Sequence, residues 1–306
     1  MAKITVLGAS GFIGSHLAEE LARRAYEVLI LDDLSTGKME NIKGLLDSGL
    51  VTFVRGTVIE LPLLQKLFDN VDYVFHQAAL ARVPFSVQNP LAVNEANVTG
   101  TLNVLLAARD SGVKKVIYAS SAAVYGDTVT LPHKEEMVPN PQSPYAVTKL
   151  AAEYYCQVFQ TIYGLPTASL RYFNVYGPKQ DPESDYAAVI PRFIKRASDG
   201  KSLIIFGDGE QSRDFVFVGD VVRANILAAE SDVTGVFNIA QGRRVTINEL
   251  ARSIIHTMNK DVGTTRQGPR VGDVRHSLAD ISKARLLSYE PQYDLERGLK
   301  ETIGSP

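Results

Sequence analysis

Ile4-Thr5-Val6-Leu7-Gly8-Ala9-Ser10-Gly11-Phe12-Ile13-Gly14 is a short apolar run followed by three glycines at G-x-x-G-x-x-G spacing. The run predicts a strand, and the residues after it, Phe12–Arg24, predict a helix with apolar side chains on one face. In such a strand–turn–helix unit the first glycine permits a tight turn, the second lets the backbone approach a pyrophosphate, and the third lets the helix pack on the sheet. The N-terminus of the helix adds free N–H groups and a positive partial charge. We therefore predict a dinucleotide-binding turn with contacts from Gly8, Gly11, Phe12, Ile13 and Gly14.

The second predicted strand, Val28–Leu31, runs into Asp32, which lies 18 residues after Gly14. That interval is close to the one at which dinucleotide-binding folds carry an acidic residue. A carboxylate there can bind both ribose hydroxyls and would repel a 2′-phosphate. Asp32 therefore favours NAD over NADP as the cofactor, whereas the neighbouring Asp33 is interpreted as a solvated loop acid.

Strand-like and helix-like segments alternate through the first half of the chain. Further strands are predicted at Val51–Val54, Tyr73–Phe75, Lys115–Ala119 and Thr167–Leu170, and further helices at Asn97–Asp110 and Tyr145–Tyr163. This alternation predicts an α/β fold with a doubly wound parallel sheet of the Rossmann type, covered by helices on both faces. We expect residues 1–172 to form the NAD-binding domain.

The regular alternation of strand-like and helix-like segments ends after Tyr172. Two short strands and three helices are predicted there, at Leu203–Phe206, Val236–Ile239, Val189–Arg196, Gly219–Ala229 and Ile247–Met258. We expect residues 173–306 to form a smaller C-terminal α/β region that binds the substrate. Segments near 207–240 are expected to return to the first domain, so that the two parts interleave.

The 306 residues carry 32 Lys plus Arg and 34 Asp plus Glu, a formal net charge of −2. This balance argues against a nucleic-acid binder, which would show a basic excess. The single Cys156 cannot form an internal disulfide, which fits a reducing compartment. No apolar run approaches the roughly 18 residues of a membrane span, and the N-terminal run is too short for the core of a signal peptide. We therefore expect a cytoplasmic protein that binds neither membranes nor nucleic acids and holds no metal.

Chemically reactive side chains follow the fifth predicted strand. Lys115–Ala119 runs into Ser120 and Ser121, at the edge of the sheet where α/β folds bind ligands. Tyr145 and Lys149 come later, at a predicted helix start, and share one helical face because they are four residues apart. A Y-x-x-x-K pattern alone is typical of solvated surface helices. The order of glycine turn, strand-end serines and Y-x-x-x-K favours an active site instead.

Four further segments complete a pattern that runs from Lys3 to about Leu299. They are His76-Gln77-Ala78-Ala79, Asn97-Val98-Thr99-Gly100-Thr101, Arg171-Tyr172-Phe173-Asn174-Val175-Tyr176-Gly177-Pro178 and Gly207-Asp208-Gly209-Glu210-Gln211-Ser212-Arg213-Asp214-Phe215. Together with the glycine turn and the Y-x-x-x-K pattern, they resemble the nucleotide-sugar epimerase/dehydratase family of extended short-chain dehydrogenases/reductases. The individual motifs are common, but their combination is specific to that family.

The resemblance assigns Tyr145 as the acid/base, Lys149 as its partner on the nicotinamide ribose, and Ser121 as the residue that orients the reacting hydroxyl. A free tyrosine titrates near pH ~10, so lowering its pKa toward ~7 takes about 4 kcal/mol of preferential phenolate stabilisation. A nearby ammonium and the positive nicotinamide ring can supply much of that. The resemblance also implies cofactor contacts at Thr57, Val58, Ala78 and Asn97. Thr57 stands where most relatives carry an Asp near the adenine.

The resemblance further implies that the substrate is a UDP-sugar. Its expected contacts are Ser121, Tyr145, Asn174, Val189, Phe206, Arg213, Arg270, Asp273 and Ser277. Arg213 and Arg270 can pair with the diphosphate through charge-assisted hydrogen bonds, Asn174 resembles a further diphosphate contact, and Phe206 resembles the aromatic that stacks on uracil. Ser277 stands where the family borders the C2 substituent of the sugar, and a small residue there leaves room for an N-acetyl group.

Relatives that eliminate water carry an Asp-Glu pair just after the strand-end hydroxyl residue, where this chain has Ala122 and Ala123. Two methyl groups cannot transfer protons, so the resemblance favours reversible 4-epimerisation through a transient 4-keto sugar and enzyme-bound NADH. The segment Gly272–Asp280 resembles epimerases of UDP-N-acetylglucosamine and UDP-N-acetylgalactosamine, and we favour that pair. A UDP-glucose or UDP-glucuronate 4-epimerase, another nucleotide-sugar dehydratase or reductase, and a non-catalytic NAD-binding regulator stay open.

The resemblance also implies a homodimer. In the family, two helices from each chain, here Asn97–Asp110 and Tyr145–Tyr163, pair into a four-helix bundle. The apolar side chains considered for this contact, which can equally pack against their own sheet, are Leu105, Leu106, Tyr154 and Cys156.

Overall fold

The computed structural model of the chain describes residues 2–182, 188–269 and 274–304. Its main element is a seven-stranded sheet in which all neighbouring strands are parallel. In order across the sheet, the strands are β3 (Val51–Arg55), β2 (Glu27–Asp32), β1 (Lys3–Leu7), β4 (Tyr73–His76), β5 (Lys115–Ser121), β6 (Thr167–Tyr172) and β10 (Gly235–Ile239). This order reverses direction between β1 and β4, as in the doubly wound dinucleotide-binding fold. The predicted fold class is confirmed.

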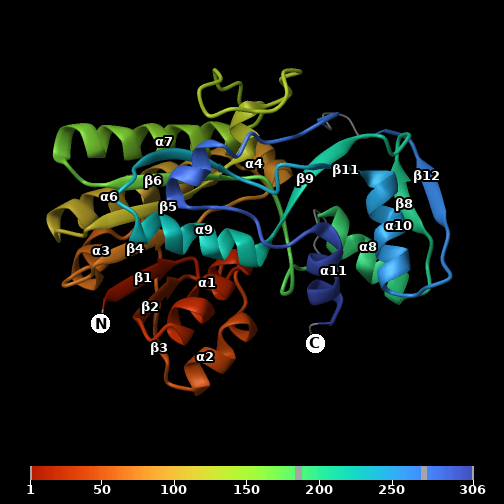
Figure 1. Cartoon of the computed structure of the whole chain (residues 1–306). Coiled ribbons are helices and arrows are strands. Elements are labelled where there is room, and N and C mark those ends of the chain that lie inside the picture. Colours follow the sequence, from red (N-terminus) through yellow and green to blue (C-terminus); the bar gives the residue numbers. More distant parts are fainter. Residues whose placement is uncertain (1, 183–187, 270–273, 305–306) are drawn as a thin grey trace.

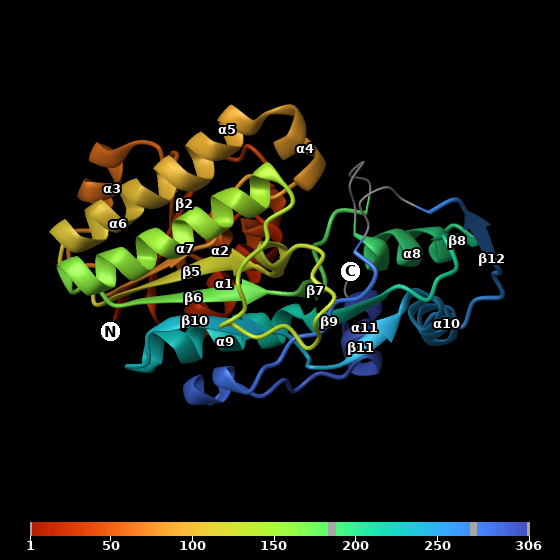
Figure 2. The same ribbon diagram turned by 90° about the horizontal axis from the view of Figure 1, so that it is seen from above.

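Helices cover both faces of this sheet, as Figures 1 and 2 show. On one face lie α3 (Leu61–Leu67), α6 (Gly100–Asp110) and α7 (Pro144–Tyr163), and on the other lie α1 (Phe12–Arg23) and α9 (Val218–Glu230). A parallel strand covered on both faces is apolar along most of its length rather than alternating. β2 shows such an apolar run at Val28–Leu31. In β6 all six residues are buried, although four of its side chains carry polar groups.

The 20-residue helix α7 owes its ends to the local sequence. Ser143 caps its N-terminus, with Oγ accepting a hydrogen bond from the Ala146 backbone N–H at 3.2 Å, and Pro144 occupies the first turn. Gly164 ends the helix in the left-handed conformation, at a φ of 69°. Tyr145 and Lys149 therefore lie in the first two turns of α7, at the end that faces the carboxyl edge of the sheet.

The remaining part of the chain forms two small sheets and three helices beside the large sheet (Figure 2). One small sheet contains β11 (Arg244–Thr246), β9 (Ser212–Phe217) and β7 (Asn174–Tyr176), and the other contains β12 (Thr264–Gln267) and β8 (Leu203–Phe206). The helices are α8 (Val189–Ser198), α10 (Ile247–Thr257) and α11 (Leu295–Gly304). The chain returns to the large sheet at β10, which pairs with β6. The division into two domains at residue 172 stays a prediction.

The structure also contains elements that the sequence patterns do not predict. Besides α3, β7, β9, β11, β12 and α11, they are α2 (Lys43–Asp47), α4 (Val83–Gln88), α5 (Pro90–Asn94) and short helical turns at Met39–Asn41, Ala122–Tyr125 and Lys283–Leu287. The predicted helix Asn97–Asp110 begins differently, because a π-helical turn at Glu95–Thr99 leads into α6. Short elements of this kind carry too few residues to show a period in the sequence.

Apolar side chains fill a layer on each face of the large sheet. Leu105 and Cys156 lie fully buried in the layer beneath α6 and α7, so they pack against their own sheet, whereas Tyr154 is 52% exposed.

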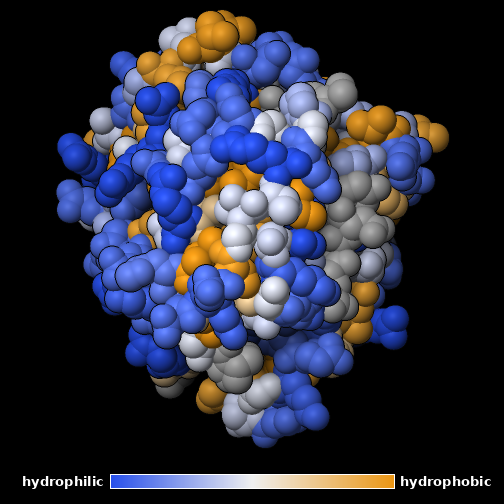
Figure 3. Space-filling view, turned by 90° about the vertical axis from the view of Figure 1, so that its right-hand side faces the viewer, coloured by the Kyte–Doolittle hydropathy of each residue, from blue (hydrophilic) through white to orange (hydrophobic). Residues whose placement is uncertain are grey.

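On the side of the small sheets, weakly polar and apolar side chains gather near the centre of the surface within a hydrophilic border (Figure 3). No helix in the described part of the chain is long and apolar enough to cross a membrane.

Candidate active site

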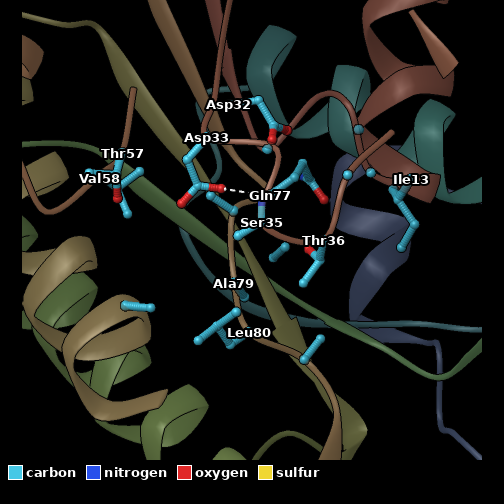
Figure 4. A pocket seen from close by; sticks show the side chains of 18 of the residues that line it. Ile13, Asp32, Asp33, Ser35, Thr36, Thr57, Val58, Gln77, Ala79 and Leu80 are labelled. Atoms are coloured by element: carbon cyan, nitrogen blue, oxygen red, sulfur yellow. Dashed lines mark hydrogen bonds between the residues drawn. The ribbon is translucent and has the colours of Figure 1, made fainter. Parts of the chain in front are cut away.

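A cavity of about 480 Å³ lies at the carboxyl edge of the large sheet, where the strand order reverses. This is the position at which open α/β sheets bind ligands. Its walls come from the glycine turn, the ends of β2 and β5, the segments after β3 and β4, and the start of α7. Figure 4 shows part of these walls, including Ile13, Asp32, Asp33, Ser35, Thr36, Thr57, Val58, Gln77, Ala79 and Leu80.

The glycine turn brings backbone close to backbone. Gly8 has a φ of +78°, and a Cβ atom there would lie 2.6 Å from the backbone of Ala78. A Cβ on Gly14 would lie 2.3 Å from the carbonyl oxygen of Gly8, so neither position has room for a side chain. Gly11 begins α1 without any side-chain cap, which leaves the first N–H groups of the helix available to a phosphate at the cavity wall. Predicted contacts Phe12 and Ile13 also line this wall.

Asp32 lies at the end of β2 with its carboxylate on the cavity wall. One carboxylate oxygen accepts a hydrogen bond from the Ser10 N–H at 2.8 Å and the other from the Leu34 N–H at 2.9 Å. Burial raises the pKa of Asp32, and the two backbone donors oppose that rise. Each carboxylate oxygen keeps a further lone pair, which fits the pair of ribose hydroxyls expected there.

The loop after Asp32 contributes more to the cavity than the sequence pattern indicates. Asp33, interpreted as a solvated acid, is exposed and also lines the wall, with its carboxylate accepting a hydrogen bond from the Ser35 N–H at 2.8 Å (Figure 4). Ser35, Thr36 and Gly37 line the same wall. The signal in the sequence was the polar stretch that follows the second strand, although nothing in it showed that the loop folds back over the glycine turn.

The other predicted cofactor residues divide into two groups. Thr57, Val58 and Ala78 line the cavity, as expected for contacts with a bound group. Asn97 is buried behind the wall, where its Oδ1 accepts a hydrogen bond from the Leu80 N–H at 2.8 Å and its Nδ2 donates to the Leu80 carbonyl at 3.1 Å. Asn97 therefore fixes the shape of the wall through Leu80.

Tyr145 and Lys149 lie side by side on the buried face of α7, and both line the cavity. The Lys149 amine donates a hydrogen bond to the Ala119 carbonyl at 2.7 Å and lies 5.9 Å from the centre of the Tyr145 ring. Burial lowers the pKa of Lys149 to about 7, against the opposing attraction of Glu153. Burial also raises the pKa of Tyr145, and a hydrogen bond with Ser121 opposes that rise.

The two strand-end serines make different hydrogen bonds. Ser120 lines the cavity, but its hydroxyl donates to the buried carboxylate of Glu153. Ser121 accepts a hydrogen bond from the Ala123 N–H at 3.1 Å. Its hydroxyl also bonds to Tyr145 and lowers the pKa of that tyrosine, as a donor to the phenolate does. This difference supports the choice of Ser121 over Ser120.

Of the predicted substrate residues, Tyr145 on α7 lines the cavity and Ser121 on β5 does not. The other described members of the set lie in or beside the small sheets and in helix α8. Arg270 and Asp273 lie outside the described residues. The five others, which do not line the 480 Å³ cavity in the described part of the chain, are Asn174, Val189, Phe206, Arg213 and Ser277.

The small sheet brings part of this substrate set together. Asn174 pairs with Phe215, two residues after Arg213, so Asn174 and Arg213 point to one face of that sheet. The Ser277 N–H donates to the Ser212 carbonyl at 3.0 Å, which places Ser277 beside the same strand. Val189 begins α8, and Phe206 ends β8 with the guanidinium of Arg192 5.7 Å from its ring centre.

Comparison with known proteins identifies the family. Residues 4–240 match the NAD dependent epimerase/dehydratase family. A UDP-N-acetylglucosamine 4-epimerase from Methanobrevibacter ruminantium, solved with UDP-N-acetylmuramic acid, is 44% identical, with a TM-score of 0.96 over 99% of this chain and 97% of that one. A UDP-glucose 4-epimerase from Thermotoga maritima, solved with UDP-glucose, is 40% identical, with a TM-score of 0.93 over 99% and 97% of the two chains.

A third structure, a UDP-glucose 4-epimerase from Thermus thermophilus in complex with NAD, is 36% identical, with a TM-score of 0.88 over 99% of this chain and 98% of that one. The glycine turn, the uncapped start of α1 and the carboxylate at the end of β2 fit that cofactor. The predicted family and its cofactor, NAD, are therefore confirmed. The chain belongs to the NAD-dependent epimerase/dehydratase family.

Proposed function

We propose that this chain is a UDP-sugar 4-epimerase that interconverts UDP-N-acetylglucosamine and UDP-N-acetylgalactosamine. The observation that carries the proposal is that Tyr145 and Lys149 line the cavity, with Ser121 hydrogen-bonded to Tyr145 and followed by two alanines. As an isomerase, the enzyme regenerates its cofactor in every turnover.

The residues that would hold NAD are those of the cavity wall. The N–H groups at the start of α1 would bind the pyrophosphate, Asp32 would bind the ribose hydroxyls, and Thr57 and Val58 would contact the adenine. When bound, NAD would supply the acceptor and donor for the hydride at C4 of the sugar.

The side chains of the protein move the proton on O4. Tyr145, as the phenolate, removes the O4 proton when C4 is oxidised and returns it when C4 is reduced. The Lys149 ammonium stabilises that phenolate, and the Ser121 hydroxyl orients the oxygen at C4. Burial alone would keep the phenol protonated, because burial raises the pKa of Tyr145. The positive charge of Lys149 is therefore essential to the reaction.

Epimerisation also requires that the 4-keto sugar turns over while its nucleotide stays bound. We propose that Asn174 and Arg213, which share one face of the small sheet, hold the diphosphate, together with Arg270 and Asp273. Phe206 would stack on the uracil. A firm hold on the nucleotide and few contacts with the sugar let either face of C4 meet the cofactor.

The two alanines argue against the dehydratase alternative. Ala122 and Ala123 form a short helical turn directly after Ser121, and neither side chain can act as an acid or base. Retention of Tyr145 and Lys149 at the cavity argues against a non-catalytic regulator.

UDP-glucose stays open as a substrate because one 40% identical relative is a UDP-glucose 4-epimerase, and UDP-glucuronate stays open as well. We favour the N-acetylated pair because of the small side chain at Ser277 and the 44% identical UDP-N-acetylglucosamine 4-epimerase.

The decisive assay incubates the purified protein with NAD and, separately, with UDP-N-acetylglucosamine, UDP-glucose and UDP-glucuronate. Products are separated by chromatography, and their masses are measured by mass spectrometry. We expect UDP-N-acetylgalactosamine, a product of unchanged mass. Loss of water would indicate a dehydratase, loss of carbon dioxide a decarboxylase, and no conversion of any of the three sugars would overturn the proposal.

Two further properties belong to the same proposal. The single Cys156 supports a cytoplasmic enzyme, since a protein without disulfides suits a reducing compartment. The exposed apolar side chains of α7 support a homodimer.

A further inference from the structure

A buried ion pair lies behind the reactive end of the cavity, and the mechanism above does not use it. The Arg171 guanidinium binds the Glu153 carboxylate in two places, Nε to Oε1 at 2.9 Å and Nη2 to Oε2 at 2.7 Å. The Glu153 side chain is 0% exposed and that of Arg171 is 4% exposed. Replacing a buried pair of this kind by apolar side chains is often neutral or stabilising. Stability alone therefore does not explain why charges lie here.

The position of Glu153 links it to the reactive residues. Tyr145, Lys149 and Glu153 lie at four-residue intervals on the buried face of α7, one turn apart. Lys149 bonds to the Ala119 carbonyl, and the next residue of β5, Ser120, donates its hydroxyl to Glu153. Both side chains are thus fixed to consecutive residues of one strand.

Glu153 is also the source of negative charge beside Lys149. The titratable groups that face the Lys149 amine come from α7, β5 and β4, and they are Tyr145, Glu153, Cys156, Tyr118 and His76. Burial raises the pKa of the tyrosines and the cysteine and lowers that of His76 to about 3, so these four groups are neutral at neutral pH. Among the groups in this set, only Glu153 carries a charge opposite to that of the ammonium.

We propose that Glu153 is a positioning residue whose carboxylate, held in place by Arg171 and Ser120, keeps Lys149 in its cationic form beside Tyr145. The inference rests on the proposed function, in which the Lys149 ammonium stabilises the Tyr145 phenolate. Arg171 fixes the direction of the carboxylate through its two hydrogen bonds. Without the carboxylate, no opposite charge would offset the burial of the ammonium, and Lys149 would lose its proton more readily.

The test measures the titration of Lys149 directly, in protein labelled with ¹³C at the lysine ε-carbon and without substrate. The variant Lys149→Met identifies the signal. In Glu153→Gln we expect the Lys149 pKa to fall by about one unit or more, because a neighbouring opposite charge shifts a pKa by roughly 1–3 units. An unchanged Lys149 titration in a folded Glu153→Gln protein would overturn the proposal.

Two more variants keep the test decisive. Glu153→Gln leaves the Arg171 guanidinium buried without its partner, so the paired variant Glu153→Gln/Arg171→Met removes both charges and should show the same fall in the Lys149 pKa. The matched control Arg171→Met keeps the carboxylate, and there the Lys149 pKa should not fall. An equal fall in the control would show that disruption of packing, rather than loss of the Glu153 charge, is responsible.

A kinetic measurement completes the design. In the wild-type enzyme, loss of the Lys149 proton should limit kcat at high pH, and in Glu153→Gln this limit should move to lower pH with the same direction as the NMR titration. The titration needs no turnover. A protein that fails to epimerise any sugar would therefore refute the proposed function while the role of Glu153 in holding the charge of Lys149 is still measured.

Discussion

At the scale of single residues, we propose that the side chain at position 277 separates the candidate sugars. Ser277 is half-buried and bonded through its backbone to Ser212, next to Arg213 on β9. A small side chain there leaves space that a larger one would fill. Under this proposal, the choice between N-acetylated and plain hexoses depends on the side-chain volume at position 277.

Replacing Ser277 by Tyr should reduce kcat/KM for UDP-N-acetylglucosamine by at least about tenfold while changing that for UDP-glucose much less, because steric discrimination in a pocket is typically of this size. Ser48→Tyr, at an exposed position after α2, is the matched control and should leave both values unchanged. The measurement is steady-state kinetics on both sugars. Equal losses on the two sugars would contradict the steric role of Ser277.

The sequence predicts some of these residues well and misses others for a physical reason. Asp32 follows from its interval after the glycine turn. The four-residue spacing of Tyr145 and Lys149 predicts only that they share one helical face, and the order of the motifs and the family resemblance give them their roles. The partnership of Glu153 with Arg171 joins α7 to β6, 18 residues away. Nothing local marks that acid as buried.

At the scale of elements, the large sheet is predictable because each of its strands is a compact apolar run between turn residues. The small sheets are different. All four residues of β12 (Thr-Thr-Arg-Gln) are exposed, and β7 has three residues, so neither shows the apolar pattern of a strand. These strands exist because distant partners, β8 and β9, offer edges to pair with. Pairing across the chain decides their structure.

The junction of β1 and α1 gives a prediction at this scale. Gly14→Ala should destabilise the protein by about 1–3 kcal/mol and weaken NAD binding, because the added methyl would lie 2.3 Å from the Gly8 carbonyl. Gly44→Ala in α2 is the control, since a Cβ there meets nothing within 4 Å. Urea unfolding and NAD titration measure both effects. If the two variants behave alike, the close packing of the turn does not hold the cofactor site.

At the scale of the whole molecule, α7 leaves one face uncovered. Its exposed apolar residues are Val147, Tyr154, Tyr155, Val158, Ile162 and Tyr163. The opposite face of the helix packs on the sheet and carries Tyr145 and Lys149. A second chain that covers the exposed face would therefore also hold the reactive helix in place.

Val158→Lys should convert a dimer into a monomer, because a buried ammonium without a partner opposes association. Light scattering measures the mass. Leu286→Lys is the matched control: Leu286 is 62% exposed on the short helix that packs against β10 and α9, away from α7. A wild-type protein with the mass of one chain would refute the homodimer.

Stability toward acid should depend on His76. Burial lowers the pKa of His76 from its ordinary value of 6.5 to about 3. Between these two pH values, the His76 imidazole is therefore protonated in the unfolded chain and neutral in the folded chain. The contribution to stability is therefore complete above pH 6.5 and is lost as the pH falls toward 3, with a slope of about 1.4 kcal/mol per pH unit. Urea unfolding between pH 7 and 4 should show this slope in the wild type and a smaller one in His76→Asn. Equal slopes would exclude His76 as its source.

The most direct test of the account is the turnover of Tyr145→Phe with UDP-N-acetylglucosamine. The variant lacks only the hydroxyl that moves the O4 proton, and we expect kcat to fall by about 10²–10⁴ while NAD binding and unfolding free energy stay close to wild type. A Tyr145→Phe enzyme with wild-type kcat would show that Tyr145 does not perform the chemistry and would contradict the account.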